Sequence, residues 1–201
     1  MKNLKFISSF LLLSLILYSC GSDTKEIQEV KLTGKLVNWG NASKILNSQS
    51  LEADFGLGND VLIETNEAEE FELKFELSEP TYYSLGRNKL YLSPGDELYM
   101  EVDYKDPEAA IFKGTHQDLQ TYLSSVAFPK SGSYLEGGRN LKNPDVAETV
   151  DLAARVTHER REMLEALDAP EEFKKLEEMR LKLDQMNTIL SMPVYGSFKD
   201  Y

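Results

Sequence analysis

The residue types that most often carry out chemistry are scarce in this 201-residue chain, and they do not cluster. The chain has one cysteine, Cys20, and two histidines, His116 and His158, which lie far apart in the sequence. A histidine metal site needs ligands at short helical spacing, and disulfide exchange needs a second thiol near the first. Neither arrangement occurs, and no serine lies in a Gly-x-Ser-x-Gly elbow. The sequence therefore predicts no catalytic residue, no metal site and no cofactor.

Three weaker candidate sites have simpler explanations. The segment 54–60 has acidic and amide residues beside two glycines, but it lacks the Asp-x-Asp-x-Asp-Gly order of a calcium loop. Glu67, Glu69 and Glu70 could act as paired carboxylates on a glycoside, but a solvated acidic bend is favoured. A set of strand tyrosines could stack on a ligand, but half-buried packing is favoured; the set is Tyr82, Tyr83, Tyr91, Tyr99 and Tyr104.

The N-terminus has the pattern of a secretory signal. Lys2 and Lys5 precede an apolar run of about a dozen residues, and Ser19 is small. The run is shorter than the roughly 20 apolar residues that a membrane-spanning helix needs. We therefore expect residues 1–19 to be a signal peptide.

The end of this signal resembles the lipobox of bacterial lipoproteins. The residues are Leu17-Tyr18-Ser19-Cys20, and only Tyr18 departs from the usual pattern. The resemblance implies cleavage between Ser19 and Cys20, with a lipid on the Cys20 thiol; the alternative is an ordinary signal peptide with an incidental cysteine. Lipoproteins that stay at the inner membrane often have an aspartate directly after the cysteine, whereas here Gly21 follows Cys20 and Asp23 comes later. The chain therefore resembles the outer-membrane class, and the expected location is the outer membrane of a Gram-negative bacterium.

The net charge of the chain limits the classes of molecule that it is expected to bind. The formal net charge is −12, and loss of Lys2 and Lys5 with the signal makes it more negative. Such an acidic surface argues against nucleic acid and against electrostatic adhesion to anionic lipid. Membrane attachment is therefore expected through the lipid on Cys20.

From Val30 to Phe112 the sequence predicts one short strand after another. In the segment 71–77 phenylalanine and leucine alternate with charged residues, as in a half-buried antiparallel strand. Ser93-Pro94-Gly95-Asp96 predicts a type II turn that either joins adjacent strands or turns a corner between sheets. About seven or eight strands with frequent turns predict a β-sandwich or a curled antiparallel sheet.

After Gly114 the apolar spacing becomes helical. Thr115 is expected to cap a first helix, and Asn143 and Pro144 are expected to begin a long one. Asp168-Ala169-Pro170 breaks the long helix, and Pro193 is expected to end the next. The expected fold class is α+β, an antiparallel β-sandwich-like domain followed by a C-terminal helical hairpin. The expected divisions are a signal at 1–19, a tether at 20–29, a β domain at 30–114, a helical part at 115–192 and a tail at 193–201.

The apolar side of the hairpin is the candidate protein-binding surface. We expect it to include Met163, Leu167, Phe173, Met179 and Leu183. If these residues pack on the sheet, the chain is complete in itself. If they face solvent, a partner or a further domain is implied.

Several short motifs occur in a recognisable order. They are Gly34–Asn38, Phe71–Leu77, Tyr82–Leu85, Leu90–Leu98, Phe112–Thr115 and Leu119–Leu123. This order resembles the N-terminal β module and helical spacer of lipid-anchored thiol–disulfide oxidoreductases of the TlpA-like thioredoxin family. In that family a thioredoxin domain with Cys-x-x-Cys follows, and this chain ends where that domain would begin. Without a second cysteine, disulfide exchange has no residue to act through.

These observations predict a non-catalytic cell-envelope lipoprotein that binds or positions another molecule. One alternative is an accessory or truncated component of a thioredoxin-like disulfide reductase system. Another is a structural or surface interaction lipoprotein.

Overall fold

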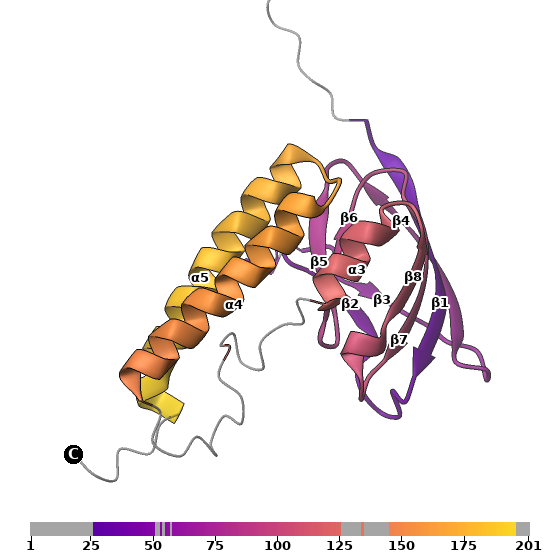
Figure 1. Cartoon of the computed structure of the whole chain (residues 1–201). Coiled ribbons are helices and arrows are strands. Elements are labelled where there is room, and N and C mark those ends of the chain that lie inside the picture. Colours follow the sequence, from indigo (N-terminus) through magenta and orange to yellow (C-terminus); the bar gives the residue numbers. More distant parts are fainter. Residues whose placement is uncertain are drawn as a thin grey trace, which may run out of the picture.

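The expected α+β architecture is confirmed by the computed structural model (Figure 1). The structure describes residues 26–50, 53, 55–56, 58–125, 134 and 145–195, with the backbone alone at 192–195. Ser19, Cys20 and the rest of the expected signal peptide lie outside the described residues. Two four-stranded sheets face each other, and a pair of long helices packs beside them.

The first sheet has the strand order β4-β1-β7-β8. Its strands are β1 (Gln28–Val37), β4 (Glu70–Leu77), β7 (Glu97–Asp103) and β8 (Ile111–Gly114). β1 runs antiparallel to β4 but parallel to β7, and β7 runs antiparallel to β8. β1 and β7 approach closely at Gly34, where a Cβ atom would lie 1.7 Å from the carbonyl oxygen of Met100. Only glycine fits at that position.

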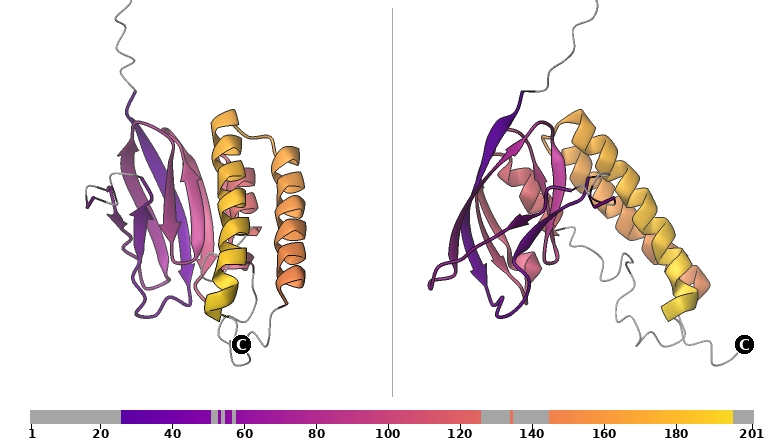
Figure 2. Two further views of the ribbon diagram at one scale, coloured as in Figure 1. Left: turned by 90° about the vertical axis from the view of Figure 1, so that its left-hand side faces the viewer. Right: turned by 180° about the vertical axis from the view of Figure 1, so that it is seen from behind.

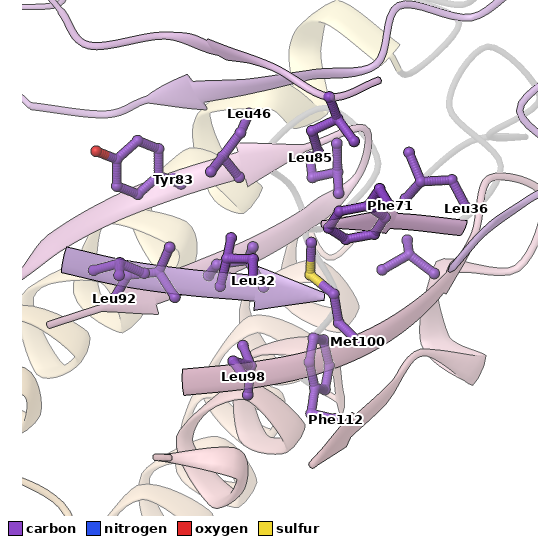
Figure 3. Packing of buried hydrophobic residues seen from close by; sticks show 14 of the residues in the cluster. Leu32, Leu36, Leu46, Phe71, Tyr83, Leu85, Leu92, Leu98, Met100 and Phe112 are labelled. Carbon is purple, nitrogen blue, oxygen red and sulfur yellow. The ribbon is translucent and has the colours of Figure 1, made fainter. Parts of the chain in front are cut away.

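The second sheet has the order β3-β2-β5-β6, and all its pairs are antiparallel. Its strands are β2 (Ile45–Ser48), β3 (Val61–Leu62), β5 (Thr81–Leu85) and β6 (Asn88–Leu92). Apolar side chains from both sheets meet between them and form the main core (Figure 3). Those labelled in the figure include Leu32, Leu46, Leu85, Leu98, Met100 and Phe112.

The turn predicted at residues 93–96 is present and connects the two sheets. The Asp96 amide donates to the carbonyl oxygen of Ser93 at 3.1 Å, and Gly95 has a φ of 83°. This positive φ is the conformation that a type II turn requires at its third residue. Because β6 and β7 belong to different sheets, the turn makes a corner between them.

The short helix α3 (Gln117–Ser125) covers the edge of β6. The Gln120 side-chain amide donates to the Tyr91 carbonyl oxygen at 2.6 Å, and its oxygen accepts from the Tyr91 amide at 3.1 Å. The Gln120 side chain thus makes the two backbone hydrogen bonds to Tyr91 that a neighbouring strand would otherwise make. The expected cap at Thr115 is wrong, because its hydroxyl accepts from the Glu97 amide and His116 precedes the first helical turn.

The predicted helical hairpin is confirmed as α4 (Val146–Ala166) and α5 (Glu171–Tyr195), separated at the expected break. The expected N-cap at Asn143, which lies outside the described residues, is wrong; Asp145 is the cap, and its carboxylate accepts from the Glu148 amide at 3.0 Å. Pro193 does not end α5, which continues to Tyr195. α5 contacts the second sheet, and α4 packs along α5 (Figure 2).

Candidate functional site

The two histidines lie on different elements, each beside a carboxylate. His116 Nδ1 lies 3.1 Å from Asp96 Oδ1, next to the corner between the sheets. His158 Nε2 lies 3.4 Å from Glu162 Oε1 on the exposed side of α4. Among the described residues, no three side chains of the metal-binding types come together. The helical hairpin is the most unusual feature of the described part of the chain.

The buried face of α5 is largely polar. At its N-terminal end Phe173 is fully buried and contacts the rings of Tyr82, Tyr91 and Tyr122, with centroids 5.0 to 6.3 Å apart. Farther along, Leu181 is the one large apolar residue that is buried beyond Phe173 in the described part of this helix. The buried polar residues of this face are Glu177, Thr188 and Ser191.

Glu177 is the centre of a buried charged cluster. Its carboxylate accepts a hydrogen bond from the Tyr82 hydroxyl at 2.9 Å. It also accepts from Arg180 Nε at 3.0 Å to each oxygen, and from Arg180 Nη2. Arg180 and Arg160 both approach Asp184 Oδ2, at 3.6 Å and 3.9 Å. We call Tyr82, Arg160, Glu177, Arg180 and Asp184 the charged cluster.

The electrostatics of the charged cluster favour a neutral tyrosine beside charged partners. Burial, helped by the Glu177 carboxylate, raises the pKa of Tyr82 well above its ordinary value, so the phenol remains a donor. Burial alone would lower the pKa of Arg180, but its hydrogen bonds to Glu177 raise it. Burial raises the pKa of Asp184, and this effect outweighs the opposing attraction of Arg180 and Arg160.

The opposite side of α5 carries an exposed row of large apolar residues. Their exposed fractions are 42%, 61%, 57%, 57% and 67%. In order they are Leu176, Met179, Leu183, Met186 and Leu190, which we call the α5 stripe. Their spacing alternates between three and four residues, which is the a and d spacing of a heptad repeat. A helix that buries charges and exposes leucines has its faces reversed relative to an ordinary surface helix.

The residues expected to form the partner surface lie in three places. Met179 and Leu183 belong to the α5 stripe, and Met163 is 44% exposed but lies on α4. Phe173 is fully buried and Leu167 is partly buried against the same aromatic cluster, so neither belongs to the exposed row. Successive helical residues are about 100° apart, which places Phe173 in line with Glu177 rather than with Leu183. Leu176, Met186 and Leu190 complete the α5 stripe, and their regular spacing is visible in the sequence.

Comparisons with protein-family models, curated proteins and solved structures found no match for this chain. Among the described residues, no helix is both long enough and apolar enough to cross a membrane. In the structure α5 contacts the β domain through Tyr82 and has an apolar row facing outward. Such a surface is suited to binding another apolar surface.

Proposed function

We propose that this protein is a non-catalytic cell-envelope lipoprotein, anchored through Cys20, that binds a partner protein through the α5 stripe. It is related, in this proposal, to the N-terminal part of lipid-anchored thiol–disulfide reductases. The observation that carries the proposal is the stripe itself. Its five exposed side chains extend over about 21 Å of helix.

The charged cluster explains why the stripe stays exposed. Turning α5 to bury its leucines would separate the Glu177 carboxylate from the Tyr82 hydroxyl on β5, and Asp184 from Arg160 on α4, whereas Arg180 would turn together with Glu177. A hydrogen bond to a charged group contributes about 1.5 to 3 kcal/mol, and its loss would leave the Tyr82 hydroxyl without an acceptor. The orientation of α5 is thus fixed by its polar side, and the apolar side is left for another molecule.

The composition of the stripe also suits protein binding. Contiguous exposed apolar side chains on a folded protein mark interaction surfaces more often than scattered ones do. Met179 and Met186 alternate with leucines, and methionine adapts its shape to the surface that it meets.

The proposal is tested by site-specific photo-crosslinking in living cells that produce the full-length protein. A photoreactive amino acid at Leu183 or Met186 is expected to give a discrete protein adduct. The matched control is Ile111 on β8, which is 46% exposed but lies in the first sheet. The proposal fails if the stripe positions give no adduct, or if Ile111 gives the same adduct.

A further inference from the structure

The chemistry of a stripe partner follows first from the spacing of the stripe. Leu176, Leu183 and Leu190 occupy a positions of a heptad repeat when Met179 and Met186 occupy d. Side chains at these positions insert between four residues of a facing helix. A second helix with the same apolar period is therefore the surface that matches the stripe best.

The residues beside the stripe add a charge requirement. Lys175 and Lys182 occupy two of the three g positions of this register, directly before Leu176 and Leu183, and Ile189 occupies the third. Among the described residues Lys175 has no ion pair, and Lys182 Nζ lies 3.6 Å from Glu178 Oε1 in an exposed pair. Such an exposed pair is weak, so Lys182 can also attract a carboxylate on a partner. The edge is basic although the whole chain has a net charge of −12.

A second copy of this chain does not meet the charge requirement. The e positions on the other edge of the stripe are Arg180 and Asn187. In a parallel pair Lys175 would face Arg180 of the other copy, and in an antiparallel pair the g positions of the two copies, Lys175, Lys182 and Ile189, would face one another. Neither orientation brings a carboxylate to Lys175 or Lys182.

We infer that the α5 stripe pairs with an amphipathic helix of another protein, whose apolar a and d residues are flanked by glutamate or aspartate at e and g. This inference rests on the proposed function and specifies the partner class. Acidic flanks would pair with Lys175 and Lys182, while basic flanks would repel them.

The test uses two synthetic peptides of about three heptads each, with the same leucine and isoleucine seam. One peptide has glutamate at e and g, and the other has lysine. Fluorescence anisotropy measures the affinity of each for the purified full-length chain. We expect the acidic peptide to bind about tenfold more tightly, and added salt to narrow the difference.

Three variants make the test specific. Combining Lys175→Glu with Lys182→Glu is expected to reverse the order of the two peptides. Combining Lys105→Glu with Lys113→Glu changes the net charge equally at exposed positions in the β domain, and is expected to leave the order unchanged. Combining Leu183→Gln with Met186→Gln is expected to abolish binding of both peptides, with an unchanged circular dichroism spectrum.

Each opposing outcome overturns the inference in a recognisable way. Equal affinities, or binding of neither peptide, contradict the acidic-helix partner. A dimer that the Leu183→Gln and Met186→Gln variant dissolves would identify a second copy as the occupant. Binding to phosphatidylglycerol vesicles that the same variant loses would identify a lipid surface. If crosslinks at Leu183 still form in cells, the proposed function stands and only the partner class is wrong.

Discussion

Replacing Glu177 by leucine removes the centre of the charged cluster. Arg180 then keeps only Asp184 nearby, at 3.6 Å, and the Tyr82 hydroxyl loses its acceptor. Glu177 is 1% exposed, so water does not take its place. Removing one partner of a buried ion pair costs about 3 to 5 kcal/mol, and we expect Glu177→Leu to lower the free energy of unfolding by that amount.

Urea denaturation followed by circular dichroism measures this loss. With an m-value of about 2 kcal/mol per molar urea, the unfolding midpoint is expected to fall by about 2 M. The unfolding of the hairpin is followed separately through the fluorescence of a probe placed on α5.

The neighbouring residue Glu178 provides a matched control. Its carboxylate accepts hydrogen bonds from Arg161 on α4 at 3.0 and 3.2 Å, but both side chains are about one-third exposed. Glu178→Leu is expected to cost about 1 kcal/mol or less, because exposed ion pairs contribute little. The double variant of Glu177→Leu and Arg180→Met removes both charges and is expected to recover most of the loss. If Glu177→Leu costs no more than Glu178→Leu, the charged cluster does not hold α5 in place.

Three further predictions concern other parts of the chain. Gln120→Ala leaves the buried amide and carbonyl of Tyr91 without partners, and is expected to lower the free energy of unfolding by about 2 kcal/mol; an unchanged urea midpoint would contradict the role of this side chain at the β6 edge. The folded-state pKa of Tyr82 is raised above its ordinary value of 10.0, so its contribution to stability is present below pH 10 and is lost as the pH rises above it. Tyr82→Phe is therefore expected to flatten the dependence of the unfolding midpoint on pH above about 10. An equally steep dependence in this variant would show that Tyr82 is not its cause. Cys20→Ser is expected to move the protein from the membrane fraction to the soluble fraction with its circular dichroism spectrum unchanged, and labelled palmitate on that variant would show that the anchor is elsewhere.

Local patterns in the sequence were sufficient to predict the β domain. The alternation of Phe71, Leu73, Phe75 and Leu77 identifies β4, since a strand with one buried face has a period of two. Pro94 and Gly95 identify the turn between the sheets because proline fixes φ and glycine can adopt the positive φ that follows. Such signals depend only on neighbouring residues, so they can be recognised without a structure.

Long-range pairing was not visible in the sequence. The parallel alignment of β1 with β7 brings together residues more than 60 positions apart. Gln120 replaces a strand at the β6 edge, although a glutamine in a helix ordinarily faces water. Neither feature has a local sequence signal, because each depends on how distant elements pack.

The orientation of the hairpin was left open by the sequence. The prediction assumed that apolar residues would share one face, which grouped Phe173 with Met179 and Leu183. In the structure Phe173 lies on the buried face together with Glu177. Charged residues become buried when they satisfy one another, and the partners of Glu177 come from β5 and from α5 itself.

Cysteine labelling tests the central claim most directly, because α5 contains no native cysteine. In a Cys20→Ser background, Leu183→Cys and Leu181→Cys place single thiols two residues apart on positions that are 57% and 0% exposed. In the purified chain we expect a maleimide to label Leu183→Cys rapidly and Leu181→Cys only on unfolding.

In intact cell envelopes that retain the native Cys20, we expect Leu183→Cys to be protected while Ile111→Cys stays reactive, because a partner covers the α5 stripe. Rapid labelling of Leu181→Cys in the folded chain would contradict the orientation of α5, and equal labelling of Leu183→Cys in envelopes and in the purified chain would contradict its role as a binding surface.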